Sequence, residues 1–350
     1  MTARAVLQTH DLIVQRPEGL YCPPGDFYID PWRPVSRAVI THAHADHARR
    51  GHAHYLAAAP AQGLMRARLG DVTLQCLDYG QSIVHHGVRL SLHPAGHVLG
   101  SAQVRLEHGG QVWVASGDYK VSPDPTCTPF EPVRCDVFIT ESTFGLPIYR
   151  WHSDEVLFGQ INAWWSANAA QGRASVLTAY SLGKAQRLLS GLDPAIAPIL
   201  VHPAVEAINR VYRDAAVALP ATAALPPSIA AAKAAGLSGA LVLCPPNALT
   251  PALLRRLGDV STAFASGWMQ LRGARRRAAY DRGFALSDHA DWPGLQGAIA
   301  ATGAQRVIVT HGSVAVMVRH LLERGLQAQA FETQYGGEPV DEAEPQEQGA

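Results

Sequence analysis

Short aliphatic runs, separated by turns rich in Gly, Pro and Asp, dominate the first half of the chain. This pattern is typical of many β-strands. The runs that predict strands are residues 38–41, 88–92, 111–115 and 136–140. Residues 153–170 have the wider apolar spacing of a helix, and 177–189 predicts a strand, a turn containing glycine and a helix that begins near Lys184.

The middle of the chain is rich in alanine and changes to an alternation of strand-like and helix-like segments. After a strand in IAPILVH, the pattern predicts a helix over 205–216, a strand in GALVLCPP and a helix near 251–257, which together indicate an α/β layer. The turn-rich, histidine-bearing style returns after Leu286, so the middle is expected to interrupt one domain. The boundaries expected are 1–172 for the first part of that domain, 173–283 for the insertion, 284–337 for the return segment and 338–350 for a disordered acidic tail.

Composition narrows the class of protein. The chain has 350 residues, of which 47% are hydrophobic and 17% charged, and its 29 Lys and Arg balance its 29 Asp and Glu. Such a chain can bury a large core, which excludes wholesale disorder. Zero net charge argues against adhesion to nucleic acid or membrane over the whole surface, so a polyanion would need a local basic patch.

The cysteines and the apolar segments indicate in which cellular compartment the protein is expected. Five scattered cysteines without a CxxC pair fit a reducing cytoplasm. The most apolar later stretch, 221–244, is interrupted by Pro226, Pro227 and Lys233, and the N-terminus lacks the pattern of a signal peptide. We expect a cytoplasmic protein with no membrane partner.

Four potential metal ligands follow the strand-like run 38–41 within six residues: His42, His44, Asp46 and His47. Neutral imidazole and carboxylate suit Zn²⁺ or a similar first-row ion. The spacing lets the first two ligands face one ion and the last two face an adjacent ion. A histidine-rich surface loop, or capping of a helix near Asp46, is the alternative interpretation, but the position directly after a strand favours a metal site.

Three more ligands follow other predicted strands, each beside a glycine. They are His97 in HPAGHVLGSA, Asp118 in VWVASGDY and His311 in VIVTHG. Glycine allows the sharp turns that bring ligands close to an ion. Taken alone, Asp118 would be interpreted as a turn residue and His97 as a hydrogen-bonded core histidine; the whole set predicts the site.

The HxHxDH motif and these later ligands resemble the metallo-β-lactamase superfamily over most of the chain. The resemblance implies two Zn²⁺ ions, with Mn²⁺ as an alternative. It implies one ion held by His42, His44 and His97, the other by Asp46, His47 and His311, and Asp118 bridging them. Asp30, in DFYIDPW, matches an early aspartate that orients ligand imidazoles; a simple turn aspartate before Pro31 is the alternative.

Other segments resemble the β-CASP nuclease branch of that superfamily, which cuts nucleic acids and interrupts the domain with a cap. They are Glu141 in ITESTFG, LTAYSLGKAQRLL from Leu177, and the SDHAD run around His289. FASGWMQLRGARRR followed by GFALSDHADW is most similar to bacterial ligase-associated DNA exonucleases. The fold implied is α/β: an αββα metallo-β-lactamase sandwich with an inserted α/β β-CASP cap.

The resemblance implies a DNA exonuclease of DNA repair that hydrolyses phosphodiesters with a hydroxide held by two metals. Asp46, Glu141 and His289 would be its catalytic residues. His289 would protonate the leaving oxygen or contact the scissile phosphate, and Glu141 would orient it; the alternative is a surface histidine and a helix-capping glutamate. The partners implied are DNA that is single-stranded or has ends, an ATP-dependent DNA ligase and a helicase.

A local basic patch precedes His289. Residues 265–284 contain five arginines against one aspartate, enough to hold a phosphate backbone. The residues expected to contact nucleic acid are Arg272, Arg275, Arg276 and Arg277, with Lys184 added by resemblance. A solvated helix face is the alternative explanation of such a charge run.

Three other functions stay open. His311 resembles the RNA-processing members of the branch, ribonuclease J and the pre-mRNA 3′-end endonuclease, so an RNA exonuclease or endonuclease is the main alternative. A small-molecule metallo-hydrolase would share the HxHxDH core but would not need an arginine-rich insertion. A non-catalytic nucleic-acid clamp is disfavoured because every expected ligand is present.

Overall fold

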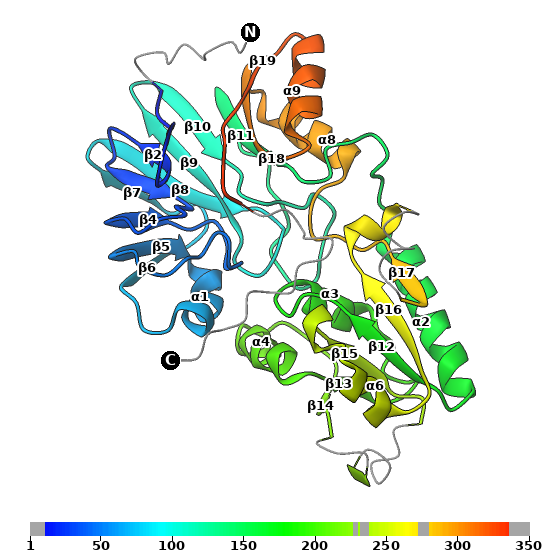
Figure 1. Cartoon of the computed structure of the whole chain (residues 1–350). Helices are drawn as coiled ribbons and strands as arrows, with labels where there is room; N and C mark the ends of the chain where they lie inside the picture. The colour runs from blue at the N-terminus through cyan, green and yellow to red at the C-terminus, as the bar shows by residue number, and fades with distance from the viewer. Residues whose placement is uncertain (1–10, 227–229, 232–237, 272–279, 336–350) are drawn as a thin grey trace. The chain divides into compact units, whose positions relative to one another are not determined.

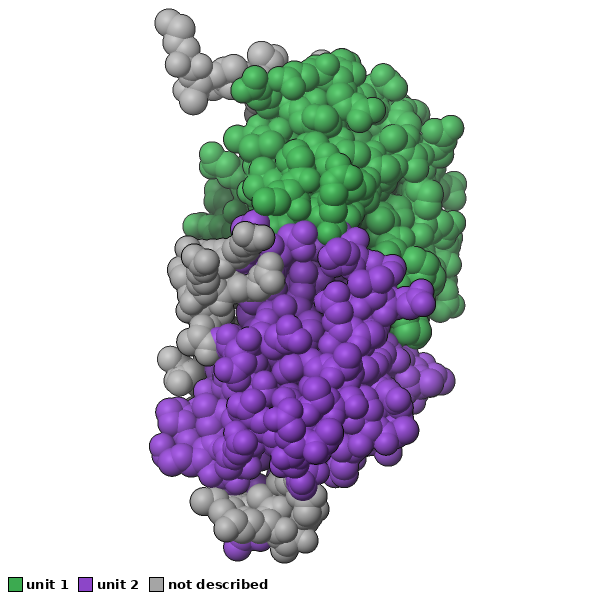
Figure 2. Space-filling model, turned by 90° about the vertical axis from the view of Figure 1, so that its right-hand side faces the viewer, with its two compact units in different colours: residues 1–150, 289–337 green, residues 151–288, 338–350 purple. Residues whose placement is uncertain are grey.

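The computed structural model describes residues 11–226, 230–231, 238–271 and 280–335 (Figure 1). They form two compact units, coloured separately in Figure 2. Unit 1 consists of residues 11–150 and 289–335, and unit 2 consists of the described residues between 151 and 288. The four arginines predicted to bind nucleic acid (272 and 275–277) and the acidic tail lie outside the described residues.

Unit 1 contains two sheets whose strands come mostly in chain order. The first has the order β1-β2-β3-β4-β5-β6 and the second β19-β18-β11-β10-β9-β8-β7. The first sheet comprises β1 (Val14–Arg16), β2 (Gly19–Cys22), β3 (Phe27–Ile29), β4 (Arg37–Val39), β5 (His54–Ala58) and β6 (Leu74–Leu77). The second comprises β7 (Ser82–His85), β8 (Val88–Pro94), β9 (Ala102–His108), β10 (Gln111–Ala115), β11 (Val137–Ser142), β18 (Arg306–Gly312) and β19 (Gln327–Ala330).

Hydrophobic residues of the two sheets share one core. Leu20 and Ile29 of the first sheet belong to the same buried cluster as Leu92 and Val104 of the second. Because side chains alternate along a strand, the second sheet has another apolar face. Val307 and its neighbours on that face pack with buried residues of α8 (Trp292–Thr302) and α9 (Val314–Glu323), the helices seen beside β18 in Figure 1.

The remaining helical turns of unit 1 are η1 (Ala59–Ala61) and α1 (Gln62–Leu69). Local sequence sets the limits of the helices. The side chain of Asp291 accepts a hydrogen bond of 2.9 Å from the Gly294 amide at the start of α8, and Gly303 ends this helix in the left-handed conformation. These are the expected N-cap and C-terminal glycine signals.

Unit 2 is built around one parallel sheet of order β14-β13-β15-β12-β16-β17. Its strands are β12 (Ala174–Thr178), β13 (Ile199–Val201), β14 (Ala223–Ala224), β15 (Leu241–Cys244), β16 (Val260–Ala265) and β17 (Arg282–Phe284). Its described helices are α2 (Asp154–Ala170), α3 (Lys184–Gly191), α4 (Pro203–Asp214), η2 (Pro246–Ala248), α6 (Pro251–Leu257) and η3 (Gly267–Gln270). Parallel strands need such crossover helices.

The parallel sheet is apolar on both faces. Leu177 packs in one cluster with residues of α2, α3 and α4, whereas its neighbour Val176 packs in another with Leu253 of α6. The layout agrees in outline with the sequence prediction, since α2, α3, α4 and α6 occupy the segments predicted to be helical. Strands β4, β8, β10 and β11 likewise coincide with the predicted strands.

α2 belongs to unit 2 in the structure, whereas the boundary expected at 172 assigned it to the first domain. The reason is its two tryptophans. Trp165 donates a hydrogen bond of 2.9 Å to the Gly239 carbonyl, and Trp164 donates one of 3.1 Å to the Ser261 hydroxyl. The sequence of α2 does not indicate this attachment, because the partners of both tryptophans lie far away along the chain.

The structure is a mixed α/β protein with several sheets, consistent with an α/β sandwich. No helix within the described parts of the chain is both long enough and apolar enough to cross a membrane.

Candidate metal centre

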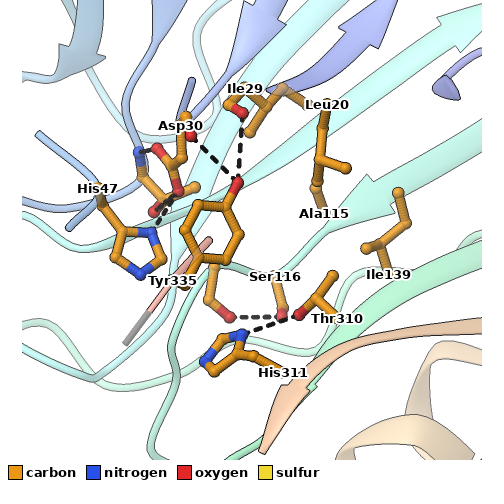
Figure 3. Close-up of a pocket in the computed structure, with 12 residues that line it drawn as sticks. Leu20, Ile29, Asp30, His47, Ala115, Ser116, Ile139, Thr310, His311 and Tyr335 are labelled. Carbon is orange, nitrogen blue, oxygen red and sulfur yellow. Dashed lines mark hydrogen bonds and ion pairs between the residues drawn. The ribbon is translucent and has the colours of Figure 1, made fainter. Parts of the chain in front are cut away.

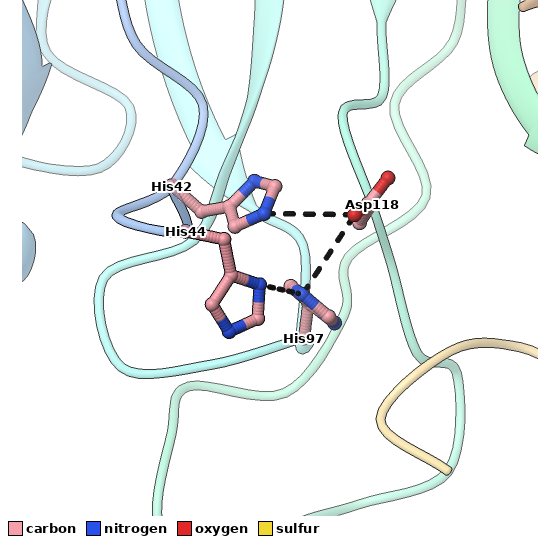
Figure 4. Close-up of side chains that lie close together, drawn as sticks. All are labelled: His42, His44, His97 and Asp118. Carbon is pink, nitrogen blue, oxygen red and sulfur yellow. Dashed lines mark hydrogen bonds and ion pairs between the residues drawn. The ribbon is translucent and has the colours of Figure 1, made fainter. Parts of the chain in front are cut away.

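Histidines and aspartates from separate loops of unit 1 meet at one place. His42 and His44 follow β4, His97 follows β8 and Asp118 follows β10. Figure 4 shows these four side chains pointing toward one another, and their candidate ligand atoms lie within 4.8 Å of each other. Strand ends and the turns after them therefore bring together residues that are 76 positions apart in the sequence.

Asp118 lies at the middle of this cluster. Its Oδ2 is 3.5 Å from His42 Nε2, 3.5 Å from His47 Nε2 and 3.9 Å from His97 Nε2. On its other side, Oδ1 is 3.1 Å from His311 Nε2. A carboxylate with an imidazole near each of its oxygens has the geometry expected of a ligand that two metal ions share.

Hydrogen bonds fix which nitrogen of each ring faces Asp118. The Thr41 hydroxyl donates to Asp30, so it must accept from Nδ1–H of His42, 3.0 Å away. The Thr310 hydroxyl donates to the Thr140 carbonyl and likewise accepts from Nδ1–H of His311 at 3.0 Å. Both rings thus present an unprotonated Nε2 toward Asp118 when neutral.

The inward atoms lack hydrogen-bond partners among the described residues. Nε2 of His42, His47 and His311 and Oδ1 of Asp118 are buried and have none. Leaving several buried polar atoms unpaired is costly. Neutral imidazole nitrogens and a carboxylate are the ligands that Zn²⁺ and similar ions prefer, so this donor set fits a divalent metal.

Asp30 connects the centre to the first sheet. Its carboxylate accepts hydrogen bonds from the Thr41 amide at 2.7 Å and the Thr41 hydroxyl at 2.5 Å, and it lies 2.7 Å from His47 Nδ1. Asp30 has a positive φ of 42°, a conformation that aspartate tolerates better than most residues. This geometry is the one that the predicted imidazole-orienting role requires.

A second group of side chains adjoins the cluster. His289 Nδ1 lies 3.0 and 2.9 Å from the two carboxylate oxygens of Glu141, at the end of β11. Glu141 is itself held by the Tyr119 amide, which donates to Oε1 at 2.8 Å. Asp118, Glu141 and His289 form another group whose candidate ligand atoms lie within 4.8 Å of one another.

The buried groups of the cluster shift one another's pKa in opposite directions. Burial, followed by repulsion from His47, lowers the pKa of His42 well below its usual value. Burial also opposes the charged form of His47, but the carboxylates of Asp118, Asp46 and Asp30 outweigh it and raise its pKa to about 10. Burial is likewise outweighed at Asp118, whose pKa is held well below its usual value first by His47 and then by His311.

Two predicted site residues lie less centrally. Asp46 is 3.7 Å from His47 Nε2 and its side chain is 29% exposed. Lys184, in unit 2 at the start of α3, is almost fully buried, with Nζ 4.0 Å from Asp288 Oδ2. The predicted contact between this amino group and a phosphate stays a prediction. The burial of Lys184 argues against it.

Tyr335 belongs to the site but was not predicted from the sequence. It follows β19 in the segment QYGG, which has no motif, yet its ring stacks on His47 with centroids 4.4 Å apart. The only sequence signal is an aromatic residue just before two glycines, which is too common to indicate a site.

No family model matches the chain. The chain is 34% identical over 317 residues to a probable DNA ligase of Opitutus terrae, a match that covers 89% of this chain and 30% of the relative. It is 32% identical over 124 residues to endoribonuclease YSH1 of Yarrowia lipolytica, covering 34% of this chain and 14% of that one. It is 30% identical over 119 residues to cleavage and polyadenylation specificity factor subunit 3 of Dictyostelium discoideum, covering 33% and 15%.

The chain thus spans less than a third of the length of each of these relatives. Among solved structures, it is similar to a protein of unknown function from Enterococcus faecalis V583, with a TM-score of 0.59, 10% identity and coverage of 86% of this chain and 80% of that chain. At this identity the similarity concerns the fold alone. The relatives that match in sequence are thus named for DNA ligation, for RNA cleavage and for polyadenylation.

Proposed function

We propose that the protein is a metal-dependent nuclease that hydrolyses phosphodiester bonds, and that its substrate is DNA attacked from an end. The observation that carries the proposal is the position of Asp118, which has histidines near both of its carboxylate oxygens and lies beside the His289–Glu141 pair. A metal centre next to a buried histidine–carboxylate pair supplies the parts that hydrolysis of a phosphodiester needs.

The residues that would hold two Zn²⁺ ions, or Mn²⁺ in their place, are His42, His44 and His97 for one and Asp46, His47 and His311 for the other, with Asp118 shared. When bound, such ions lower the pKa of water toward ~7 and neutralise negative charge on a phosphate. The chain's own contribution is to aim the rings: Thr41, Asp30 and Thr310 each occupy an Nδ1 and leave Nε2 for the ion.

His289 is the candidate proton donor. Glu141 lies 3.0 and 2.9 Å from its Nδ1 and would orient the ring and favour its protonated form, from which a proton would pass to the departing oxygen. The Tyr119 amide in turn keeps Glu141 in place. This pairing supports the proposed role of both residues in catalysis, whereas the catalytic role proposed for Asp46 rests on the sequence resemblance.

RNA is the second candidate substrate. The similarity to endoribonuclease YSH1 and to cleavage and polyadenylation specificity factor subunit 3 favours it, whereas the longer match to a probable DNA ligase favours DNA and a role in DNA repair.

The match to a probable DNA ligase also supports a ligase as a partner, and a helicase partner rests on the sequence resemblance alone. The proposed cytoplasmic location rests on the five scattered cysteines of the sequence, which contain no CxxC pair.

The substrate is tested by digesting 5′- and 3′-end-labelled single-stranded DNA, and RNA of the same sequence, with the purified protein. His86→Gln, an exposed histidine of unit 1, serves as the active control, and Asp118→Asn as the inactive one. Metal-dependent shortening of DNA from one end, absent in Asp118→Asn, is the expected result and gives the polarity.

Preferential cutting of RNA would contradict the DNA assignment and favour the alternative, an RNA exonuclease or endonuclease. Cutting of neither polymer by a protein that contains its metals would contradict the nuclease proposal and favour a small-molecule metallo-hydrolase. Activity that persists in Asp118→Asn would show contamination by another nuclease.

A further inference from the structure

Tyr335 touches two of the histidines that surround Asp118, one near each of its carboxylate oxygens. Its ring stacks on His47, with centroids 4.4 Å apart and planes inclined by 18°. It meets His311 edge-on, with centroids 5.6 Å apart and an angle of 81°. Figure 3 shows the Tyr335 ring beside both imidazoles.

The hydroxyl of Tyr335 ties it to the end of β3 and to Asp30, which follows that strand. It donates to the Asp30 carbonyl at 3.1 Å and to the Ile29 carbonyl at 3.5 Å. Because the Asp30 carboxylate holds His47 Nδ1 at 2.7 Å, the His47 ring is fixed at its edge by Asp30 and on its face by Tyr335. Both constraints act on the same imidazole.

The segment that ends in Tyr335 is itself anchored to the loop that carries the HxHxDH motif. Arg49 donates to the Gln334 carbonyl at 3.0 Å and to the Asp46 carbonyl at 3.1 Å. The Thr333 hydroxyl donates to the Thr310 carbonyl at 3.2 Å, next to His311. The segment after β19 is therefore joined to the loop that carries Asp46 and His47 and to the strand that carries His311. These three residues are the ligands proposed for one of the two ions.

The other proposed ion position has different neighbours. The ring contacts that the described residues make with Tyr335 involve Trp32, His47 and His311. His42, in contrast, is held by Thr41 and packs against His44 and His97, and it meets Tyr335 only through the His47 ring, whose centroid is 4.1 Å from its own. Direct ring contact with Tyr335 is thus limited, among the described residues, to the histidines proposed for the other ion.

A cavity of about 20 Å³ lies beside the ring, bordered among others by Asp30, Thr310 and Tyr335 (Figure 3). This space is about that of one water molecule. Removing the tyrosine ring would enlarge it and free the face of His47. The histidine could then turn away from the position at which it can bind an ion.

We propose that Tyr335 is a positioning residue for the ion held by His47 and His311, and that the ion held by His42, His44 and His97 does not depend on it. The inference rests on the proposed metal centre. It predicts that the two ions differ in their dependence on a residue that itself binds neither metal nor substrate.

The test measures how many Zn²⁺ ions bind per chain, and how tightly, by competition with a chromophoric chelator. The proteins compared are the wild type, Tyr335→Ala, Tyr335→Phe and Gln334→Ala, the last an exposed neighbour as control. Circular dichroism checks that each is folded. If Tyr335→Ala does not fold, Tyr335→Leu, which fills more of the space than alanine but has no planar ring, carries the same comparison.

We expect two ions in the wild type and in Gln334→Ala. In Tyr335→Ala one ion should keep its affinity while the other weakens about 10- to 100-fold, the usual effect of removing a partner of a metal ligand. Tyr335→Phe should weaken that ion less, because the ring remains. Equal affinities in wild type and Tyr335→Ala, or equal weakening of both ions, would overturn the inference alone, whereas fewer than two ions in the wild type would overturn the proposed metal centre as well.

Discussion

His289 shows how much a single residue depends on its neighbours. The sequence predicted its pairing with Glu141 through motif resemblance, and the structure places the two side chains 2.9 Å apart. The sequence could not reveal that the Tyr119 amide holds Glu141, because a backbone donor has no signature in the residue type. The HxHxDH ligands were predictable for the opposite reason: residue type and spacing carry their chemistry.

His289→Gln should lower the rate of phosphodiester cleavage about 10²- to 10⁴-fold, the range for loss of a general acid or base. Metal content should stay at the wild-type value, because the proposed ion ligands are unchanged. Single-turnover cleavage and metal analysis on the same sample check this, with His86→Gln as the matched control. A variant with full rate would remove His289 from the mechanism.

At the scale of elements, strand identity was predictable and strand pairing was not. The aliphatic runs of β10 and β11 are evident in the sequence, but the parallel pairing of β11 with β18 joins segments about 170 residues apart. The register shifts between Thr140 and Ser142, so that Ser142 pairs with Gly312. This irregularity lies beside Glu141 and His311, and local propensity does not encode it.

Gly312 makes that irregularity possible. Its φ is +88°, and a Cβ there would lie 2.2 Å from the Ser142 carbonyl oxygen. Gly312→Ala should lower the free energy of unfolding by about 1–3 kcal/mol from backbone conformation alone, with the clash adding to it. Urea denaturation measures the loss.

Gly325→Ala is the matched control, since Gly325 has a φ of +83° and open space around its Cβ position. It should show the conformational cost without the clash. Equal losses in the two variants would mean that close packing against Ser142 does not matter.

The N-terminus of α4 predicts a pH effect. His202 caps this helix by accepting the Ala204 amide on Nδ1 at 3.2 Å. Burial, and then Arg256, lower its folded pKa below 6.5, so below about pH 6.5 the unfolded chain binds the proton more readily. The contribution of His202 to stability should therefore fall as the pH decreases through this range.

His202→Asn retains a capping side chain that does not titrate. Urea denaturation at pH 7.5 and pH 5.5 should show a smaller acid-induced loss of stability in the variant than in the wild type. The same loss in both proteins would remove His202 as a source of the pH dependence.

At the scale of the whole molecule, the candidate site is assembled from segments between residues 30 and 335. The sequence predicted that the histidines and Asp118 would meet, because each follows a strand beside a small residue, and the structure brings their side chains together. Tyr335 and the attachment of α2 to unit 2 could not be predicted, because both depend on contacts between segments with no distinctive pattern.

A neutral chain that binds a polyanion must concentrate its charge. Replacing Arg275, Arg276 and Arg277 with Ala should weaken DNA binding. The slope of log affinity against log salt should become smaller by about 0.7 for each phosphate of a single strand that these arginines neutralise in the wild type. Binding measured between 50 and 200 mM salt, roughly the range over which this effect is large, checks it. An unchanged slope would locate the nucleic-acid path elsewhere.

The central claim is that the cluster around Asp118 binds two divalent ions and that cleavage depends on them. The most direct test removes metal from the wild type with a chelator and returns Zn²⁺ or Mn²⁺ in steps, while bound metal and DNA cleavage are measured on the same samples, with Asp118→Asn in parallel. We predict that cleavage is lost on stripping, returns as the second ion per chain binds, and does not return in Asp118→Asn. Full cleavage by the stripped protein, or two tightly bound ions in Asp118→Asn, would contradict it.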